Sequence, residues 1–258
     1  MMNATKSRNN DNVSPIACIL MASGQGRRFG SNKLLAQFQD KPLVSYALEA
    51  TAKYPFAERL LVTIHHEVKT ISDAYQVPAL LHSFPGRGQA IRLGVDTLLR
   101  KYKLKKTDTR TIFSGHSNFS ECTNPTVYTN TSVYADSSHK ESAPSSDKLS
   151  KELLGILFCP CDQPLLQAES IEKLCELFLK HPEHICRLVG DDKGDEIPGA
   201  VVIFPKRCFQ GLLSLPEKAG GSYLIKKDSL PILTVSVENP LELFDIDTPS
   251  DLDYLAGH

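Results

Sequence analysis

Three glycines and three cations lie together in one short segment of the chain. The glycines are Gly24, Gly26 and Gly30, the cations are Arg27, Arg28 and Lys33, and an apolar run precedes them directly. Glycines let a main chain approach a ligand closely and present backbone N–H donors. Arginine and lysine add charge-assisted hydrogen bonds to phosphate oxygens. The segment therefore predicts a loop that binds a nucleoside triphosphate.

Two other phosphate-binding patterns match this segment less well. A dinucleotide-binding turn has similar glycines, but it does not require the cations and expects an acid about 20 residues further on, at the end of a strand. The nearest acids, Asp40 and Glu49, fall in a predicted loop and helix. The Walker pattern is absent, because Lys33 neither follows a glycine nor precedes a serine or threonine.

Acidic residues follow two further apolar segments. Asp162 ends a predicted strand before a proline turn, which is where ligands bind in open α/β sheets. Asp245 and Asp247 share one face if their segment is extended, and Thr248-Pro249 after them reads as a helix start. Mg²⁺ prefers carboxylates together with substrate phosphates. Asp162 with one of the two later aspartates therefore forms a candidate metal site.

A second glycine-containing turn leads into a helix at Gly86 and Gly88, with Arg92 one turn further on. The amino terminus of such a helix can receive a base, a ribose or a phosphate. Taken beside the first loop, this turn is a second candidate contact for a nucleotide.

The elements that must position these residues alternate along the chain. Strands are predicted at 16–22, 59–65, 153–159, 201–204 and 233–237, and helices at 42–53, 89–101 and 170–180. A closing segment follows at 244–255. Strands that alternate with helices indicate an α/β domain with a mainly parallel sheet.

Composition limits the classes of partner. The chain has 258 residues, with 29 basic and 30 acidic side chains, so no global field favours nucleic acid or an anionic membrane. No apolar run approaches the roughly 20 residues of a membrane helix, and the polar first residues lack the apolar core of a signal peptide. We expect a cytoplasmic protein with neither nucleic acid nor membrane as a partner.

Two segments depart from the domain pattern. Residues 1–14 are predicted to be disordered, and residues 15–258 to form one domain with a polar insertion at about 105–150. The seven cysteines contain no CxxC pair, which argues against a disulfide framework. Cys159 and Cys161 are expected to be small buried side chains near the site rather than zinc or redox groups.

The four segments, in this order and spacing, resemble the MobA-like nucleotidyltransferases, and among these the molybdenum cofactor cytidylyltransferase branch. Residues 21–33 match the first family motif, residues 161–165 its metal-aspartate motif, and residues 245–252 its terminal motif; the helix start at 92–94 resembles its nucleoside-side segment. Gly24, Arg28, Gly30 and Lys33 fall on named positions of the first motif. Ala90, in place of a serine, and residues 217–222, on the implied acceptor side, depart from the family pattern.

The resemblance implies a three-layer Rossmann-like sandwich of the nucleotide-diphospho-sugar transferase kind. It implies that CMP is joined from CTP to a molybdopterin phosphate with release of pyrophosphate, and that a molybdenum hydroxylase could receive the product. Arg28, Lys33 and Asp162 are the expected catalytic residues. Asp162 and Asp245, with Asp247 as the substitute, would hold Mg²⁺ or Mn²⁺. Nucleotide binding is expected at Ala22, Ser23, Gly24, Gln25, Gly26, Arg28, Lys33, Gly86, Gly88 and Arg92.

Three alternatives stay open at this point. The acceptor or base can differ within the same class, with GTP, a sugar phosphate or phospholactate as examples. The first loop could instead serve a nicotinamide-dependent oxidoreductase. The chain could also be a non-catalytic protein that delivers the molybdenum cofactor, which would bind nucleotide but release no pyrophosphate.

Overall fold

A computed structural model of the chain describes residues 13–84, 86–102, 152–192 and 195–257. The predicted insertion at 105–150 lies outside the described residues, as does most of the segment 1–14 predicted to be disordered. The end of that segment is ordered, because Ser14 is buried, its backbone N–H donates to the Pro55 carbonyl, and its hydroxyl bonds the Tyr54 hydroxyl at 3.0 Å.

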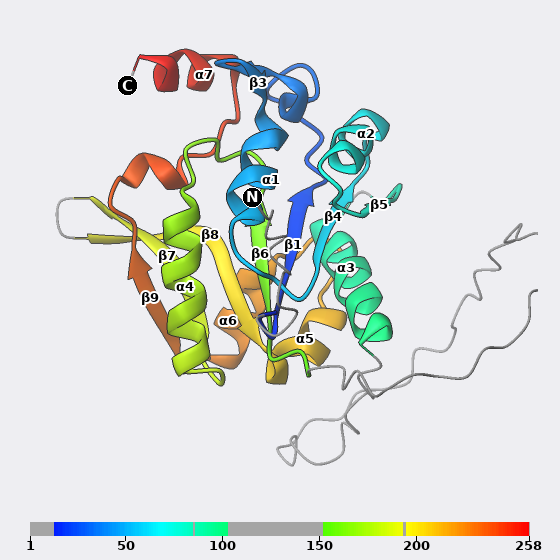
Figure 1. Cartoon of the computed structure of the whole chain (residues 1–258), viewed down its shortest axis with the longest axis vertical. Helices are drawn as coiled ribbons and strands as arrows, with labels where there is room; N and C mark the ends of the chain where they lie inside the picture. Colours follow the sequence, from blue (N-terminus) through cyan, green and yellow to red (C-terminus); the bar gives the residue numbers. More distant parts are fainter. Residues whose placement is uncertain (1–12, 85, 103–151, 193–194, 258) are drawn as a thin grey trace, which may run out of the picture. The chain divides into compact units, whose positions relative to one another are not determined.

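A seven-stranded sheet forms the centre of the described fold, in the order β5-β4-β1-β6-β8-β7-β9 (Figure 1). The strands are β1 (Ile16–Ala22), β4 (Arg59–Thr63), β5 (Ala79–Leu81), β6 (Gly155–Pro160), β7 (Ile185–Asp192), β8 (Asp195–Pro205) and β9 (Ile232–Ser236). Within this sheet, β8 alone runs antiparallel to its neighbours. Six of the seven residues of β1 are buried, as expected for a strand covered on both faces.

Helices cover both faces of the sheet. They are α1 (Leu43–Ala52), α2 (His66–Ala74), α3 (Arg87–Lys101), α4 (Ala168–Lys180), α5 (Phe209–Leu213), α6 (Gly221–Asp228) and α7 (Pro249–Ala256). Side chains of α1, α2 and α4 share one buried cluster with one face of the sheet, and those of α3, α5 and α6 share a second cluster with the other face. The predicted three-layer α/β sandwich with a mostly parallel sheet is therefore confirmed.

The predicted strands and helices are present with shifted ends, and further elements accompany them. Pro42 caps α1 rather than lying in its first turn, and β8 extends six residues before the predicted start at Val201. The elements that the sequence did not indicate are α2, β5, β7, α5 and α6, the hairpin β2 (Gln37–Phe38) and β3 (Lys41–Pro42), and the 3₁₀ turns at 33–35, 206–208 and 240–243. Most of them are short or mix polar with apolar residues, so their periodicity is weak.

The order of the strands reverses between β1 and β6. From β1 the chain moves outward to β4 and β5, and α3 then leads back to β6 on the other side of β1. The pairing of Met21 with Pro160 places the ends of β1 and β6 side by side. Ligands of open α/β sheets bind at this kind of reversal, outside the carboxyl ends of the strands. Among the described helices, none is long and apolar enough to cross a membrane.

Candidate functional site

The loop after β1 is a compact turn that requires glycine. Gly26 and Gly30 have φ angles of +59° and +81°. A Cβ atom on Gly26 would lie 2.1 Å from the Ser31 carbonyl oxygen, so a larger residue cannot be accommodated. The Gly26 carbonyl accepts hydrogen bonds from the backbone N–H groups of Phe29 and Gly30. The turn closes there and directs the following residues toward the end of β6.

Two histidines hold this loop, and sequence reasoning missed both. His65 Nε2 lies 2.9 Å from the Gly24 carbonyl oxygen, and His82 Nε2 lies 2.8 Å from the Ser23 hydroxyl. The Phe84 N–H donates to His82 Nδ1, so Nε2 carries the proton and donates to Ser23. The Ser23 hydroxyl in turn donates to the Val62 carbonyl. The Ser23–His82 pair is therefore an anchor and not a nucleophile with its base.

Acidification is expected to weaken this anchor. Burial lowers the pKa of His82, so the unfolded chain takes up the proton at a higher pH than the folded chain. The free energy of unfolding therefore falls as the pH drops through the ordinary histidine value toward the lowered one. The difference in Tm between the wild type and His82→Gln should be largest near pH 8 and shrink toward pH 5. The exposed His66→Gln variant is the control, and a difference independent of pH would contradict this role for His82.

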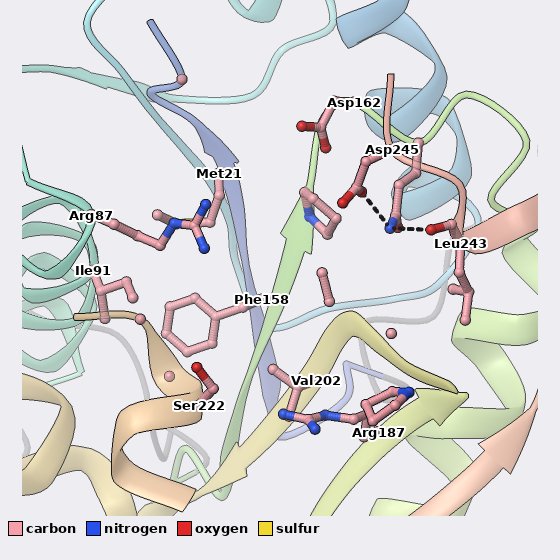
Figure 2. A pocket seen from close by; sticks show the side chains of 18 of the residues that line it. Met21, Arg87, Ile91, Phe158, Asp162, Arg187, Val202, Ser222, Leu243 and Asp245 are labelled. Atoms are coloured by element: carbon pink, nitrogen blue, oxygen red, sulfur yellow. Dashed lines mark hydrogen bonds between the residues drawn. The ribbon is translucent and has the colours of Figure 1, made fainter. Parts of the chain in front are cut away.

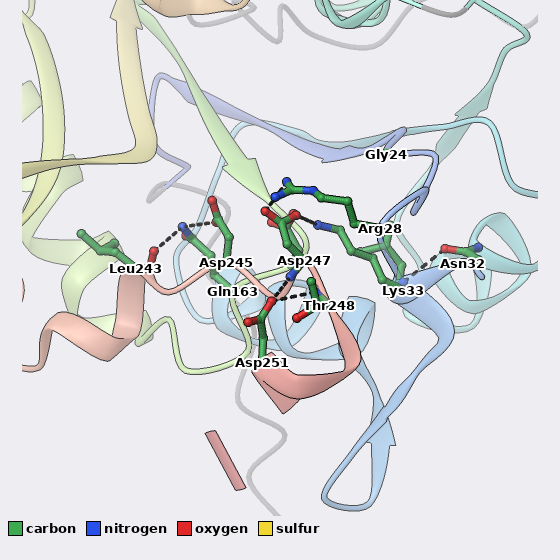
Figure 3. A network of polar contacts seen from close by, with 12 residues as sticks. Gly24, Arg28, Asn32, Lys33, Gln163, Leu243, Asp245, Asp247, Thr248 and Asp251 are labelled. Atoms are coloured by element: carbon green, nitrogen blue, oxygen red, sulfur yellow. Dashed lines mark hydrogen bonds and ion pairs between the residues drawn. The ribbon is translucent and has the colours of Figure 1, made fainter. Parts of the chain in front are cut away.

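Lys33 lies between two carboxylates that are distant in the sequence. Its Nζ is 2.8 Å from Asp247 Oδ1 (Figure 3). The same Nζ is 2.8 Å from Asp162 Oδ2. The Lys33 side chain is 10% exposed. Burial alone would lower the pKa of Lys33, but the charges and hydrogen bonds of the two aspartates outweigh it and raise the pKa. Lys33 therefore stays a cation at the reversal point of the sheet.

Asp247 bonds both Arg28 and Lys33 of the loop through its two carboxylate oxygens. Its second oxygen, Oδ2, accepts a hydrogen bond from Arg28 at 2.5 Å. The bond from Lys33, and after it the charges of Lys33 and Arg28, lower the pKa of Asp247 below its ordinary value. Asp251 fixes the backbone here, because its carboxylate accepts from the N–H groups of Asp247 and Thr248 at 2.8 and 2.6 Å. The predicted helix start, with Thr248 as the cap and Pro249 in the first turn, is present at α7.

Asp245 faces Asp162 rather than a cation. Gln163 Nε2 donates to Asp245 Oδ1 at 2.9 Å and to the Leu243 carbonyl at 3.1 Å (Figure 3). The Asp245 residue is accessible to solvent. Desolvation by the protein around its carboxylate, and after it the charge of Asp162, nevertheless raises the pKa of Asp245. Among the described residues, none hydrogen-bonds to the buried Oδ1 of Asp162. Asp162 and Asp245 thus offer hard carboxylate oxygens, one of which is buried and unpaired. Such a pair fits a divalent cation such as Mg²⁺ or Mn²⁺.

One large cavity of about 1310 Å³ opens beside these residues (Figure 2). Of the predicted site residues, the structure places Ser23, Gly24, Gln25, Gly26, Gly86, Asp162 and Asp245 in its wall. Arg28, Lys33 and Asp247 do not line the cavity but form the ion-pair network, in which the Arg28 side chain is 74% exposed. Ala22 is buried at the end of β1. Segment 217–222, whose sequence departs from the family pattern, contributes Gly220, Gly221 and Ser222 to the wall.

The expectation that Gly88 and Arg92 contact a nucleotide is not supported by their positions. Arg92 donates to the Leu215 carbonyl, and a Cβ atom on Gly88 would lie 2.0 Å from the Pro216 carbonyl oxygen. Both residues attach α3 to the loop before α6 and do not line the cavity. The reason is helical geometry, because Arg92 lies well around the helix from Arg87, which does reach the cavity.

The cysteines near the site are buried and unpaired. The six described cysteines are all free, and Cys122 lies outside the described residues. Burial raises the pKa of Cys159 to about 12 and that of Cys161 well above its ordinary value. Both side chains belong to the buried cluster that also contains Leu20 and Leu157, and they pack there as small buried side chains.

Comparisons with known proteins identify a family model and solved structures that this chain resembles. A family model described as the MobA-like NTP transferase domain matches residues 18–232. Rv0371c from Mycobacterium tuberculosis H37Rv superposes with a TM-score of 0.61 at 16% identity, covering 94% of this chain and 98% of that one, and another of its structures is a complex with manganese.

Two further solved structures share the fold. CMP:2-keto-3-deoxy-manno-octonic acid synthetase, complexed with CTP, has a TM-score of 0.59 at 11% identity and covers 95% of this chain and 98% of its own. The 4-diphosphocytidyl-2C-methyl-D-erythritol synthase of Anaerococcus prevotii DSM 20548 has a TM-score of 0.60 at 11% identity and 94% coverage of both chains. A search of curated proteins finds no significant match.

Proposed function

This chain belongs to the MobA-like NTP transferase family, and from that membership we propose that it is a Mg²⁺-dependent CTP:molybdenum cofactor cytidylyltransferase. The observation that carries the proposal is the position of Lys33, which brings the loop after β1 to Asp162 at the end of β6. A phosphate-binding loop and a metal-binding carboxylate thereby meet at one edge of the sheet. Family membership also argues against the oxidoreductase alternative, and no acid ends β4, where a dinucleotide site expects one.

The proposed reaction transfers CMP between two phosphate oxygens. An oxygen of the acceptor phosphate attacks the α-phosphorus of CTP and forms a new P–O bond. The bond from the α-phosphorus to the oxygen bridging to the β-phosphate breaks, and pyrophosphate leaves with that electron pair. The protein needs no covalent intermediate, so its contribution is positioning and charge stabilisation.

The loop residues supply positive charge to the triphosphate in this proposal. Lys33 and Arg28 neutralise phosphate oxygens, and the backbone amides of Gly24 and Gly26, which line the cavity, donate to them. Asp247 positions both cations before the nucleotide arrives, because one carboxylate bonds both of them. Such preorganisation reduces the reorganisation required during the reaction.

Asp162 and Asp245 are the residues that would hold Mg²⁺. When bound, the ion supplies neutralisation of the charge that develops on the phosphate oxygens. The structure favours Asp245 over Asp247 for this role, because both oxygens of Asp247 already bond to cations. Gln163 orients Asp245 by donating to one of its oxygens and leaves the carboxylate facing Asp162.

The two C-terminal aspartates are expected to differ in their effect on metal dependence. Asp245→Asn should raise the Mg²⁺ concentration for half-maximal activity by about tenfold or more, because it weakens a ligand. Asp247→Asn should chiefly raise the KM for CTP, because it releases Arg28 and Lys33. Pyrophosphate release measured against Mg²⁺ and against CTP separates the two effects. Equal shifts in the Mg²⁺ requirement would instead make Asp247 a ligand.

The identity of the two substrates, CTP and a molybdopterin-type acceptor, is the most specific part of the proposal. The combination of the Cys161–Leu165 and Asp245–Leu252 segments supports the molybdenum cofactor branch, and the names of two structurally similar enzymes refer to CMP and to a diphosphocytidyl product. GTP with another acceptor would keep the same site and change the product. A delivery protein for a molybdenum hydroxylase would bind nucleotide without releasing pyrophosphate.

A ligand panel followed by turnover tests the proposal. Purified protein is heated with CTP, GTP, ATP or NAD, each with and without Mg²⁺, and pyrophosphate release is then measured with molybdopterin. A ligand at 100 times its Kd stabilises the fold by about 2.7 kcal/mol, which is visible as a higher Tm. We expect selective, Mg²⁺-dependent stabilisation by CTP, followed by pyrophosphate release. Stabilisation by NAD alone would overturn the assignment, and CTP binding without turnover would favour the delivery protein.

A further inference from the structure

An arginine that has no counter-ion among the described residues lies in the cavity on the side away from the glycine loop. Arg187, on β7, is partly buried and lines the cavity (Figure 2). Its Nε is fully buried without a hydrogen-bond partner, and no carboxylate of the described residues pairs with its guanidinium. Burial lowers the pKa of Arg187. The Nε–H donor is therefore desolvated without an acceptor among the described residues, and an anion bound in the cavity would satisfy it.

The register of the sheet locates Arg187 relative to the proposed reaction. Arg187 pairs with Val202 on β8, and Val202 pairs with Phe158 on β6, so the three side chains share one face and line the cavity (Figure 2). Two strand spacings separate Arg187 from β6, or roughly 10 Å. The glycine loop follows β1, on the opposite side of β6. Arg187 therefore lies across the cavity from the segment proposed to bind the triphosphate.

The strand facing Arg187 is irregular at the same place. The pairing of β7 with β8 shifts between Arg187 and Val189, where β8 passes from Val202 to Pro198. Gly199 and Ala200, in the shifted segment, also line the cavity. Bulges interrupt the hydrogen-bond ladder and re-aim side chains next to active sites. The regular pairing of β7 with β8 therefore ends beside Arg187, where the shifted segment forms part of the cavity lining.

We infer that Arg187 binds an anionic group on the acceptor substrate, at the end distant from the reacting phosphate. The inference rests on the proposed function for the identity of the ligand as the acceptor. An acceptor that reaches both Arg187 and the end of β6 must extend roughly 10 Å or more. The planar fork of arginine binds a carboxylate, a phosphate or an oxo-metal group through two parallel hydrogen bonds. The charge at Arg187 would then select long acceptors with two separate anionic groups.

The side-chain NMR signal of Arg187 tests the anion site directly, without any assumption about the reaction. Protein with ¹⁵N-labelled arginine is titrated separately with inorganic phosphate, acetate and molybdate, which distinguish the possible sources of the charge. We expect the Nε–H signal of Arg187 to move along a saturating curve with at least one of them. Arg187→Met assigns this signal by its loss, and Arg207→Met, at an exposed arginine outside the cavity, is the matched control. A signal that none of the three anions moves would overturn the inference.

Kinetics connects the site to the acceptor. Arg187→Met should raise the KM for molybdopterin by about tenfold or more and leave kcat within about threefold, because it removes a charged hydrogen bond made before and during reaction. Arg187→Lys should recover part of the loss, since it keeps the charge but not the fork. Stabilisation by CTP with Mg²⁺ should match the wild type. An unchanged KM in Arg187→Met would refute the acceptor role, whereas absence of turnover in the wild type would count against the proposed function and leave the NMR result to decide the anion site.

Discussion

Asp162→Asn is expected to lower the rate of pyrophosphate release by roughly 10³-fold while the fold stays intact. The substitution keeps the size of the side chain but removes the negative charge that pairs with Lys33 at 2.8 Å. It also neutralises the buried Oδ1 that has no hydrogen-bond partner among the described residues. The proposed metal site would lose its central ligand, and Lys33 would lose one of its two anions.

The measurement compares turnover, CTP binding and thermal unfolding of the variant with the wild type. Asp96→Asn is the matched control, because Asp96 forms an exposed ion pair with Arg100 on α3 and does not line the cavity. The control should retain full activity, as exposed pairs of this kind contribute little. Near-normal turnover in Asp162→Asn would contradict the proposed mechanism. If Asp162→Asn does not fold, the same comparison is made with Asp162→Glu.

Lys33→Met is expected to reduce turnover by about 10²- to 10³-fold and also to lower stability. Without the ammonium group, Asp162 and Asp247 face each other with only Arg28 left to offset their charge. The Asp162 and Asp247 side chains are 23% and 35% exposed, so solvent screens part of their repulsion. A loss of about 1–3 kcal/mol in the free energy of unfolding is the corresponding expectation.

A divalent cation should restore much of this stability in the variant. Adding Mg²⁺ should raise the Tm of Lys33→Met more than that of the wild type, because an ion at Asp162 and Asp245 would offset the negative charge that Lys33 no longer neutralises. Lys206→Met serves as the control, since Lys206 pairs with Glu152 in an exposed pair. Equal Mg²⁺ effects on the variant and the wild type would place the metal elsewhere.

Much of the fold follows from local patterns that need no tertiary information. Apolar runs such as 16–22 must be buried on both faces, and segments such as 89–101 have helical periodicity. Alternation of the two kinds indicates a parallel α/β sheet. β7 was not predicted because its second half contains Gly190 and two aspartates, and β5 because it has three residues. Pairing with neighbouring strands stabilises both elements, and this pairing cannot be inferred from the sequence of either segment alone.

The histidine anchors and Arg187 illustrate the limit of sequence reasoning about the site. His65 and His82 lie about 40 and 60 residues from the loop that they hold, at spacings that fit no local motif. Arg187 is an ordinary strand residue until the sheet brings it beside Val202 and the cavity. A sequence contains charges, but it does not show which of them lack a partner.

The sequence by itself determined which residue types could handle phosphate and metal. The glycines and cations at 24–33 and the aspartates at 162, 245 and 247 are chemically suited to it wherever they lie, and sheet topology requires strand ends to meet at one edge. Only the tertiary structure decided how the acids divide their roles. Asp247 bonds the loop cations and Asp245 faces Asp162, because Asp251 and Gln163 fix the backbone and side chain of these two neighbours in different directions. Other contacts between distant segments decided the two arginines, because Arg92 bonds the Leu215 carbonyl outside the cavity, whereas the pairing of Arg187 with Val202 places it in the cavity wall.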